Sequence, residues 1–313
     1  MSKALICGSF AFDIIMNFDD TFQRHLLPEQ LHQLNVSFLV SKMRREFGGC
    51  AGNIAYNLHL LDPDAACPMG TVGKDFSDYS EWMDIKGISR KHIRIIDSVY
   101  TAQAFITTDK TGNQITIFHP GAMNHSHENR VTDAENISIG IVSPDGKQGM
   151  IDHATQFSAS GIPFIFDPGQ GMPMFVSKDL IQFMDQANWM IFNDYEFELF
   201  KERTGKSLND ARSQVDALIV TKGEAGAVIY TSNKTIEIPS VKAAAVLDPT
   251  GCGDAFRGGL LYGMLNNMDW EICGKIGSLL GAYKIASYGT QNHGVEKSTF
   301  FERLTFEFGN IFN

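Results

Sequence analysis

The sequence has few positive charges, few cysteines and no long apolar run. Its 313 residues carry 26 lysines and arginines against 36 aspartates and glutamates, which gives a net charge of −10. Nucleic-acid backbones require a basic surface, so this balance argues against nucleic acid as the main partner. It does not argue against a small anionic ligand, because such a ligand needs only local hydrogen-bond donors.

Cysteine is scarce and scattered along the chain. The five cysteines are odd in number, and no two of them have the spacing of a metal site or a CxxC pair. This usage predicts reduced thiols in a cytoplasmic protein. The apolar stretch ALICGSFAFDIIM follows Met1 closely, has no basic leader or cleavage site, and is too short to span a bilayer. We therefore expect a cytoplasmic protein with no membrane partner.

Short apolar segments alternate with helical ones along most of the chain. Residues 4–8 predict a buried parallel strand, and residues 53–61 have the apolar spacing of a helix. The stretches IGIVS, IPFIFDPG, WMIFND, ALIVTKG and AVIYT then recur between helical segments. This alternation predicts an α/β fold with a mostly parallel central sheet and helices on both faces. In such sheets ligands bind at the carboxyl ends of the strands.

Residues 100–118 have a different pattern. TAQAFITT and QITIF alternate around DKTGN, which is typical of a β-hairpin. We expect five apolar residues to share one face of this hairpin: Ala102, Ala104, Ile106, Ile115 and Ile117. Because the hairpin interrupts α/β segments, it predicts a separate small sheet.

The stretch DPTGCGDAFRGG, residues 248–259, places glycines and a carboxylate at the start of a predicted helix. The backbone N–H groups of Gly251, Cys252 and Gly253 would form an anion-binding concavity at the positive end of the helix dipole. Asp254 would then lie beside a bound phosphate and could accept the proton of an attacking alcohol. The alternative is an ordinary loop in which Asp254 caps the helix.

Four stretches, in this order, resemble the motifs of the ribokinase-like carbohydrate kinases, known as the PfkB family. They are FGGCAGNIAYNL (47–58), NDYE (193–196), VTKGEAG (220–226) and DPTGCGDAFRGG. The segments between them are most similar to bacterial adenosine and nucleoside kinases. The resemblance implies a single ribokinase-like kinase domain over residues 1–313 with a three-layer α/β fold. It also implies a small β-sheet lid contributed by roughly 13–47 and 100–118.

The same resemblance implies the residues of the catalytic and substrate sites. Asp254 would be the base, beside an anion hole formed by Gly251, Cys252 and Gly253. Cys252 stands where the family more often has Ala or Ser, but the backbone N–H is the working group there. The substrate-binding positions are Asp13, Gly48, Gly49 and Asn53. Asp13 would accept hydrogen bonds from two sugar hydroxyls, and the glycine pair would bend as the lid closes.

The nucleotide and the cations also have implied positions. Residues that resemble the nucleotide site are Asn193, Thr221, Gly223 and Gly226. Glu196 would organise Mg²⁺ through water, and Asp248 and Thr250 resemble a monovalent cation site for K⁺.

Several of these residues have a purely structural alternative. Asn53 and Asn193 could cap helices, Glu196 could be an acid near a helix start, and Asp13 could be a solvated loop acid. Arg44 and Arg45 could approach phosphates or lie at a sheet edge. The histidines of one segment, His119, His125 and His127, have no further ligand at metal-site spacing, so we expect a polar loop.

Together these features predict an ATP-dependent nucleoside kinase. It would transfer the γ-phosphoryl group to the ribose 5′-hydroxyl of a purine nucleoside, with adenosine as the expected acceptor, giving AMP and ADP. The alternatives are a ribokinase- or fructokinase-type sugar kinase and, less favoured, a non-catalytic sugar- or nucleoside-binding protein. A nicotinamide dehydrogenase is disfavoured because GCGDAF lacks the third glycine of the dinucleotide fingerprint. The expected ligands are ATP, Mg²⁺ and K⁺, and the chain could act as a monomer or a homodimer.

Overall fold

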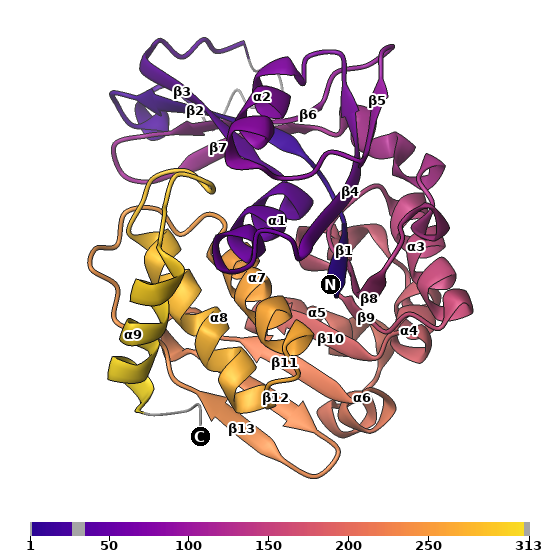
Figure 1. Ribbon diagram of the computed structural model, residues 1–313. Coiled ribbons are helices and arrows are strands. Elements are labelled where there is room, and N and C mark those ends of the chain that lie inside the picture. Colours follow the sequence, from indigo (N-terminus) through magenta and orange to yellow (C-terminus); the bar gives the residue numbers. More distant parts are fainter. Residues whose placement is uncertain (1, 27–34, 310–313) are drawn as a thin grey trace.

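The computed structural model describes residues 2–26 and 35–309. Their strands form one large and one small sheet (Figure 1). The large sheet has nine strands, here in the order in which they pair: β13 (Thr235–Ile238), β12 (Ala227–Thr231), β11 (Ala217–Thr221), β10 (Trp189–Asn193), β9 (Phe164–Phe166), β8 (Ile137–Val142), β1 (Lys3–Cys7), β4 (Ala66–Gly73) and β5 (His92–Ile96). From β11 to β5 the neighbours are parallel, whereas β12 and β13 are added antiparallel. The predicted, mostly parallel central sheet is confirmed.

Helices cover both faces of this sheet. One face packs against α1 (Cys50–Leu61), α7 (Cys252–Leu265), α8 (Trp270–Ile285) and α9 (Lys297–Phe308), with α2 (Ser77–Lys86) near its edge. The other face packs against α3 (Lys147–Ser160), α4 (Ser177–Gln186), α5 (Asp194–Thr204) and α6 (Leu208–Gln214). Side chains of β1 alternate between these two layers: Ala4 and Ile6 join the first, Leu5 and Cys7 the second. The result is the predicted three-layer arrangement.

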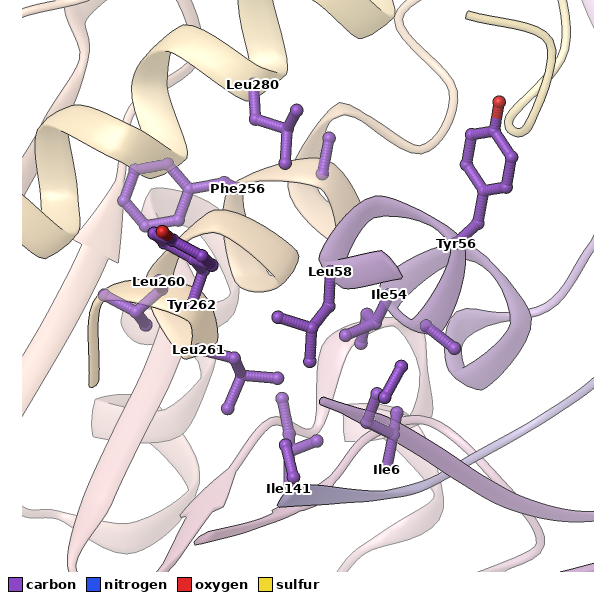
Figure 2. Close-up of a cluster of buried hydrophobic side chains, with 14 of the residues drawn as sticks. Ile6, Ile54, Tyr56, Leu58, Ile141, Phe256, Leu260, Leu261, Tyr262 and Leu280 are labelled. Carbon is purple, nitrogen blue, oxygen red and sulfur yellow. The ribbon is translucent and has the colours of Figure 1, made fainter. Parts of the chain in front are cut away.

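The layer that contains α1 and α7 has a tightly shared core. Figure 2 shows Ile54 and Leu58 of α1 and Leu261 of α7 pointing toward Ile6 and Ile141 on the central strands. All five side chains are fully buried. This packing fixes the beginnings of α1 and α7 at the carboxyl ends of the central strands, where a ligand site is expected.

The small sheet lies above those carboxyl ends (Figure 1). It consists of four strands, in the order β3 (Val40–Gly48), β2 (Ala11–Phe18), β6 (Ala102–Thr108) and β7 (Gln114–His119). The chain enters β2 shortly after it leaves β1, and β3 ends at the start of α1. All four strands of this sheet overlap the two segments predicted to form a lid, whereas residues 27–34 of the first segment are outside the described part of the chain.

The hairpin of β6 and β7 forms as predicted, but the prediction that its five apolar residues share one face is wrong. Thr108 pairs with Gln114 across the turn of residues 109–113. Even-numbered residues of β6 therefore pair with even-numbered residues of β7. Phe105 therefore lies opposite Ile117. Paired residues of an antiparallel ladder share a face, so Ile115 and Ile117 lie on the face opposite to Ala104.

Within the residues described, no helix is both long and apolar enough to cross a membrane. Short 3₁₀ turns connect several of the elements: η1 (Phe22–Arg24), η3 (Gly121–Glu128), η4 (Val131–Asp133), η5 (Gly169–Met174) and η6 (Gly223–Ala225).

Candidate active site

The glycine-rich loop leads directly into α7. Gly251 is the N-cap of that helix, with a left-handed φ of 78°, and a Cβ there would lie 3.0 Å from the Thr290 side chain. A glycine is therefore required. The N–H of Cys252 donates to the carbonyl of Pro249 at 3.2 Å and so takes part in the turn that shapes the loop. N–H groups at a helix start lack intrahelical acceptors, and the three predicted donors lie at this end of α7.

Asp254 lies in the first turn of α7 and is partly buried. Its Oδ2 accepts a hydrogen bond from Nδ2 of Asn53 at 2.8 Å. Burial raises the pKa of Asp254 to about 6, although the charge of Arg257 and the Asn53 hydrogen bond oppose the shift. At pH 7 the carboxylate is mostly ionised and is a stronger base than an ordinary aspartate, which suits a proton acceptor.

Asn53 is an interior residue of α1 and does not cap it, because the helix begins at Cys50 and its N-cap is Gly49. Its amide nitrogen holds Asp254, while its Oδ1 accepts a hydrogen bond from Nε2 of Gln291 at 3.0 Å. The alternative that Asn53 serves as a helix cap is therefore wrong. The side chain instead fixes the orientation of the Asp254 carboxylate.

Asp13 joins the same site from the small sheet. Burial raises its pKa to about 6, and the charges of Asp254, Asp248 and Glu46 add to this shift. Asp13 is therefore close enough to Asp254 to feel its charge. The space beside it depends on Gly48, since a Cβ at that position would lie 2.7 Å from Oδ2 of Asp13.

Gly49 completes the junction between the small sheet and α1. Its φ is 87°, and a Cβ there would lie 2.5 Å from Cα of Phe10. The glycine pair thus lets the end of β3 pass against the connection between β1 and β2. The contact holds Asp13 and the start of α1 side by side.

A buried ion pair, which the sequence patterns did not single out, supports the glycine-rich loop before α7. Arg257 and Asp167 are 6% and 1% exposed. The guanidinium donates to both carboxylate oxygens, with Nη2 2.6 Å from Oδ1, and Nη1 donates to the carbonyl of Gly253 at 3.0 Å. Asp167 lies in the strand-like stretch IPFIFDPG, and Arg257 lies in the glycine-rich stretch DPTGCGDAFRGG. An acid at a strand end and an arginine in a helix beside a glycine loop could have indicated the pair.

The predicted nucleotide residues lie at the carboxyl ends of two neighbouring strands, where Asn193 of β10 pairs with Thr221 of β11. Asn193 and Glu196 form a capping box at the start of α5. Oδ1 of Asn193 accepts from the Glu196 N–H at 2.7 Å, and Oε2 of Glu196 accepts from the Asn193 N–H at 2.8 Å. Burial raises the pKa of Glu196, and the charge of Asp167 adds to the shift. The helix-cap alternative thus describes contacts that exist, and lone pairs remain free for other ligands.

The loop after β11 turns through two glycines in left-handed geometry. Gly223 has φ 56° and Gly226 φ 86°, and a Cβ at Gly226 would lie 2.1 Å from the carbonyl oxygen of Ile238. The hydroxyl of Thr221 donates to the carbonyl of Phe192 at 3.3 Å. This backbone therefore passes close to its neighbours without side chains in the way.

The remaining candidates lie at different places. Nη2 of Arg44 is 3.6 Å from Oδ2 of Asp248, whereas Nη1 of Arg45 pairs with Asp78 at 2.9 Å. In η3, His125 contacts Glu128 at 2.8 Å. Across residues 2–26 and 35–309, no group of three or more His, Cys, Asp or Glu side chains is arranged to hold a metal ion.

Comparisons with known proteins give matches over nearly the whole chain. The model of the pfkB family carbohydrate kinases matches residues 11–297. A structure of Burkholderia thailandensis nucleoside kinase in complex with inosine is 48% identical, with a TM-score of 0.90, and the match covers 98% of this chain and 99% of that one. A nucleoside kinase of Methanocaldococcus jannaschii is 32% identical over 295 residues, which cover 94% of this chain and 93% of the relative.

The fold is shared more widely than the sequence. Ribokinase from Thermotoga maritima is only 20% identical, yet its structure matches with a TM-score of 0.81 over 97% of this chain and all of that one. At this identity the likeness concerns the fold alone. The predicted ribokinase-like architecture is confirmed.

Proposed function

This chain belongs to the pfkB family of carbohydrate kinases, and we propose that it is an ATP-dependent nucleoside kinase acting on the ribose 5′-hydroxyl of a purine nucleoside. Two findings support the proposal. Relatives named nucleoside kinases match nearly its whole length, and one structure of the Burkholderia enzyme, 50% identical over 98% of this chain, is described with ADP-inosine. We propose adenosine as the acceptor, giving AMP and ADP, with inosine as the purine nucleoside to compare first.

The observation that carries the proposal is that Asp254, in the first turn of α7, lies close enough to Asp13, on β2 of the small sheet, for its charge to raise the pKa of Asp13. Asp254, oriented by Asn53 at 2.8 Å, is the proposed base. It accepts the hydroxyl proton as the 5′-oxygen bonds to the γ-phosphorus and the bond to the bridging oxygen of ADP breaks. Asp13, an acceptor when ionised, suits the two ribose hydroxyls. The N–H groups of residues 251–253 would stabilise charge on the transferring group, and that of Cys252 would share its present bond to the carbonyl of Pro249.

We further propose that Asn193, Thr221, Gly223 and Gly226 bind the nucleotide and that Glu196 holds Mg²⁺ through water. The residues present fit this cation, since Mg²⁺ prefers oxygen ligands and keeps several waters. The capping bonds occupy only part of the acceptor capacity of Glu196, so a water-mediated contact is compatible with them. When bound, Mg²⁺ would neutralise charge on the phosphates.

The small sheet is the proposed lid of a single kinase domain spanning residues 1–313. Its closure over the nucleoside would exclude water, which would otherwise take the phosphoryl group. Gly48 and Gly49 are the proposed hinge. We propose a cytoplasmic enzyme, in agreement with the free thiols of all five cysteines. We propose that it acts as a monomer or a homodimer.

The deciding experiment measures ADP release by the purified protein with ATP and Mg²⁺. The acceptors are adenosine, inosine, guanosine, cytidine, ribose and fructose 6-phosphate, and a reaction without acceptor is the control. Turnover with purine nucleosides is expected, with adenosine the best. Turnover confined to ribose or fructose 6-phosphate would contradict the nucleoside assignment while keeping the chemistry of Asp254. If ADP release with every acceptor is no faster than in the control, the proposed kinase activity is contradicted.

A further inference from the structure

Lys284 is a buried cation beside the glycine-rich loop. It lies in the last turn of α8 and is 0% exposed. Its Nζ donates to the backbone carbonyl of Asp248 at 2.7 Å and to that of Ser287 at 3.1 Å. A lysine is rarely buried to this degree unless its ammonium is paired.

These contacts lie where the family resemblance implies a monovalent cation. Such an ion is held by backbone carbonyl oxygens and carboxylates, which replace its hydration shell. Here the carbonyl of Asp248 is already occupied by an ammonium, a compact point charge with three donors. The ammonium therefore competes for the same oxygens as the ion would.

The carboxylate of Asp248 also has partners within the chain. Its Oδ1 accepts from the N–H of Thr250 at 3.0 Å, and its Oδ2 accepts from the N–H of Gly289 at 3.0 Å. Arg44 from the small sheet approaches the same Oδ2 at 3.6 Å. A further cation would meet the positive charges of Lys284 and Arg44, so the residues present do not fit K⁺.

We propose that the ammonium of Lys284 stands in for the monovalent cation, so that this kinase needs no K⁺. Lys284 acts as a positioning residue. It ties the end of α8 to the loop that leads into Gly251, and through that loop it orders the N–H groups of the anion hole. The expected effect of K⁺ on turnover rests on the proposed kinase function, whereas the expected effect of K⁺ on the thermal midpoint does not.

The first test uses the unaltered protein in potassium chloride and in choline chloride at equal ionic strength. We expect turnover in the two salts to agree within about twofold, and the thermal midpoint to show no rise specific to K⁺. Activation by K⁺ of about tenfold or more, or a rise of the midpoint in K⁺ alone, would overturn the proposal. If no acceptor is phosphorylated, the proposed function fails, but the melting comparison still tests Lys284.

The second test removes the ammonium. In choline chloride, Lys284→Ala should lose about tenfold or more in turnover, and K⁺ or NH₄⁺ should restore part of the loss and raise the thermal midpoint. Lys275→Ala is the matched control, since Lys275 lies on the same helix and pairs with Glu271 at 2.7 Å. It should behave as the unaltered protein. Full turnover of Lys284→Ala in choline would overturn the proposal; if the variant does not fold, the first test decides.

Discussion

The two sheets contribute to one site in different ways. On the large sheet, the loop before α7 rests on the Asp167–Arg257 pair, which is almost wholly buried. On the small sheet, the edge strand β7 is exposed along its entire length. The proposed base thus lies in the densely packed part of the molecule, whereas the proposed ribose ligand Asp13 lies on an inner strand of a sheet whose outer strand is exposed. Precise positioning matters most for the group that moves the proton.

The two carboxylates differ in what surrounds them. Asp254 faces the compensating charge of Arg257 and the amide of Asn53, whereas the charges that act most strongly on Asp13 are those of further acids. Asp13 therefore lacks comparable compensation in the absence of substrate. Ribose hydroxyls would supply the missing donors.

The sharpest way to break this comparison is to neutralise each acid in turn. Asp254→Asn should lower kcat by about 10²–10⁴-fold, because it removes the proton acceptor of the transfer step. Asp13→Asn should chiefly raise KM for the nucleoside. Steady-state kinetics with both substrates separates the two, and ATP binding measured by calorimetry should survive in both. A near-normal kcat for Asp254→Asn would contradict the assignment of the base.

The difference in burial predicts a difference in stability between two arginines. Arg257→Met leaves Asp167 buried and unpaired, and should lower the free energy of unfolding by about 3–5 kcal/mol. Arg45→Met is the matched variant on the small sheet, where the pair with Asp78 is exposed, and should cost about 1 kcal/mol or less. Urea denaturation measures both. Equal costs would show that the two regions do not differ in this respect.

The pH profile tests whether the two acids act as one pair. Protonation of Asp254 removes the base, so kcat/KM should fall by about tenfold per unit as pH drops below its pKa of about 6. The charge of Asp254 adds to the raised pKa of Asp13, so we expect the two acids to titrate as a coupled pair. Replacing Asp13 by Asn should move the midpoint to lower pH, because one repelling charge is gone. A profile that stays flat down to pH 5 would exclude Asp254 as the ionised base.

The smallest effect is expected at the outer strand. Ile117 is 65% exposed, so Ile117→Thr should change the free energy of unfolding by about 0.5 kcal/mol or less. Ile141→Val, in the core of the large sheet, should cost about 0.5–1.5 kcal/mol. Thermal melts at several protein concentrations compare them. A larger, concentration-dependent cost at Ile117 would indicate that a second copy covers β7.

Much of this architecture was predictable because local hydrophobic patterns determine it. The buried strand at residues 4–8 appears as Lys3–Cys7, and the helix expected at residues 53–61 appears as Cys50–Leu61. Hydrophobic periodicity decides such elements within a few residues of sequence. The prediction that the apolar residues of the β6–β7 hairpin share one face is wrong. Which residues of the two strands share a face depends on the register of their pairing, and composition does not reveal the register.

The supporting contacts have a weaker signal in the sequence than these elements. Asp167 and Arg257 are 90 positions apart, and Lys284 is 36 positions from the carbonyl that it binds. Partners at such distances are chosen by topology, once strands and helices have taken their places. The motif resemblance pointed to Asp254 and Asp13, but it carried no information about which buried charges brace the loop.

The parallel pairing of β2 with β6 has a consequence for synthesis on the ribosome. β2 pairs with β3 soon after it is made, but its other edge must wait for β6 until α1, β4, α2 and β5 have emerged. At about 5–20 residues per second this delay lasts several seconds. During that interval the nascent chain presents an unpaired strand edge, which is open to association with other chains.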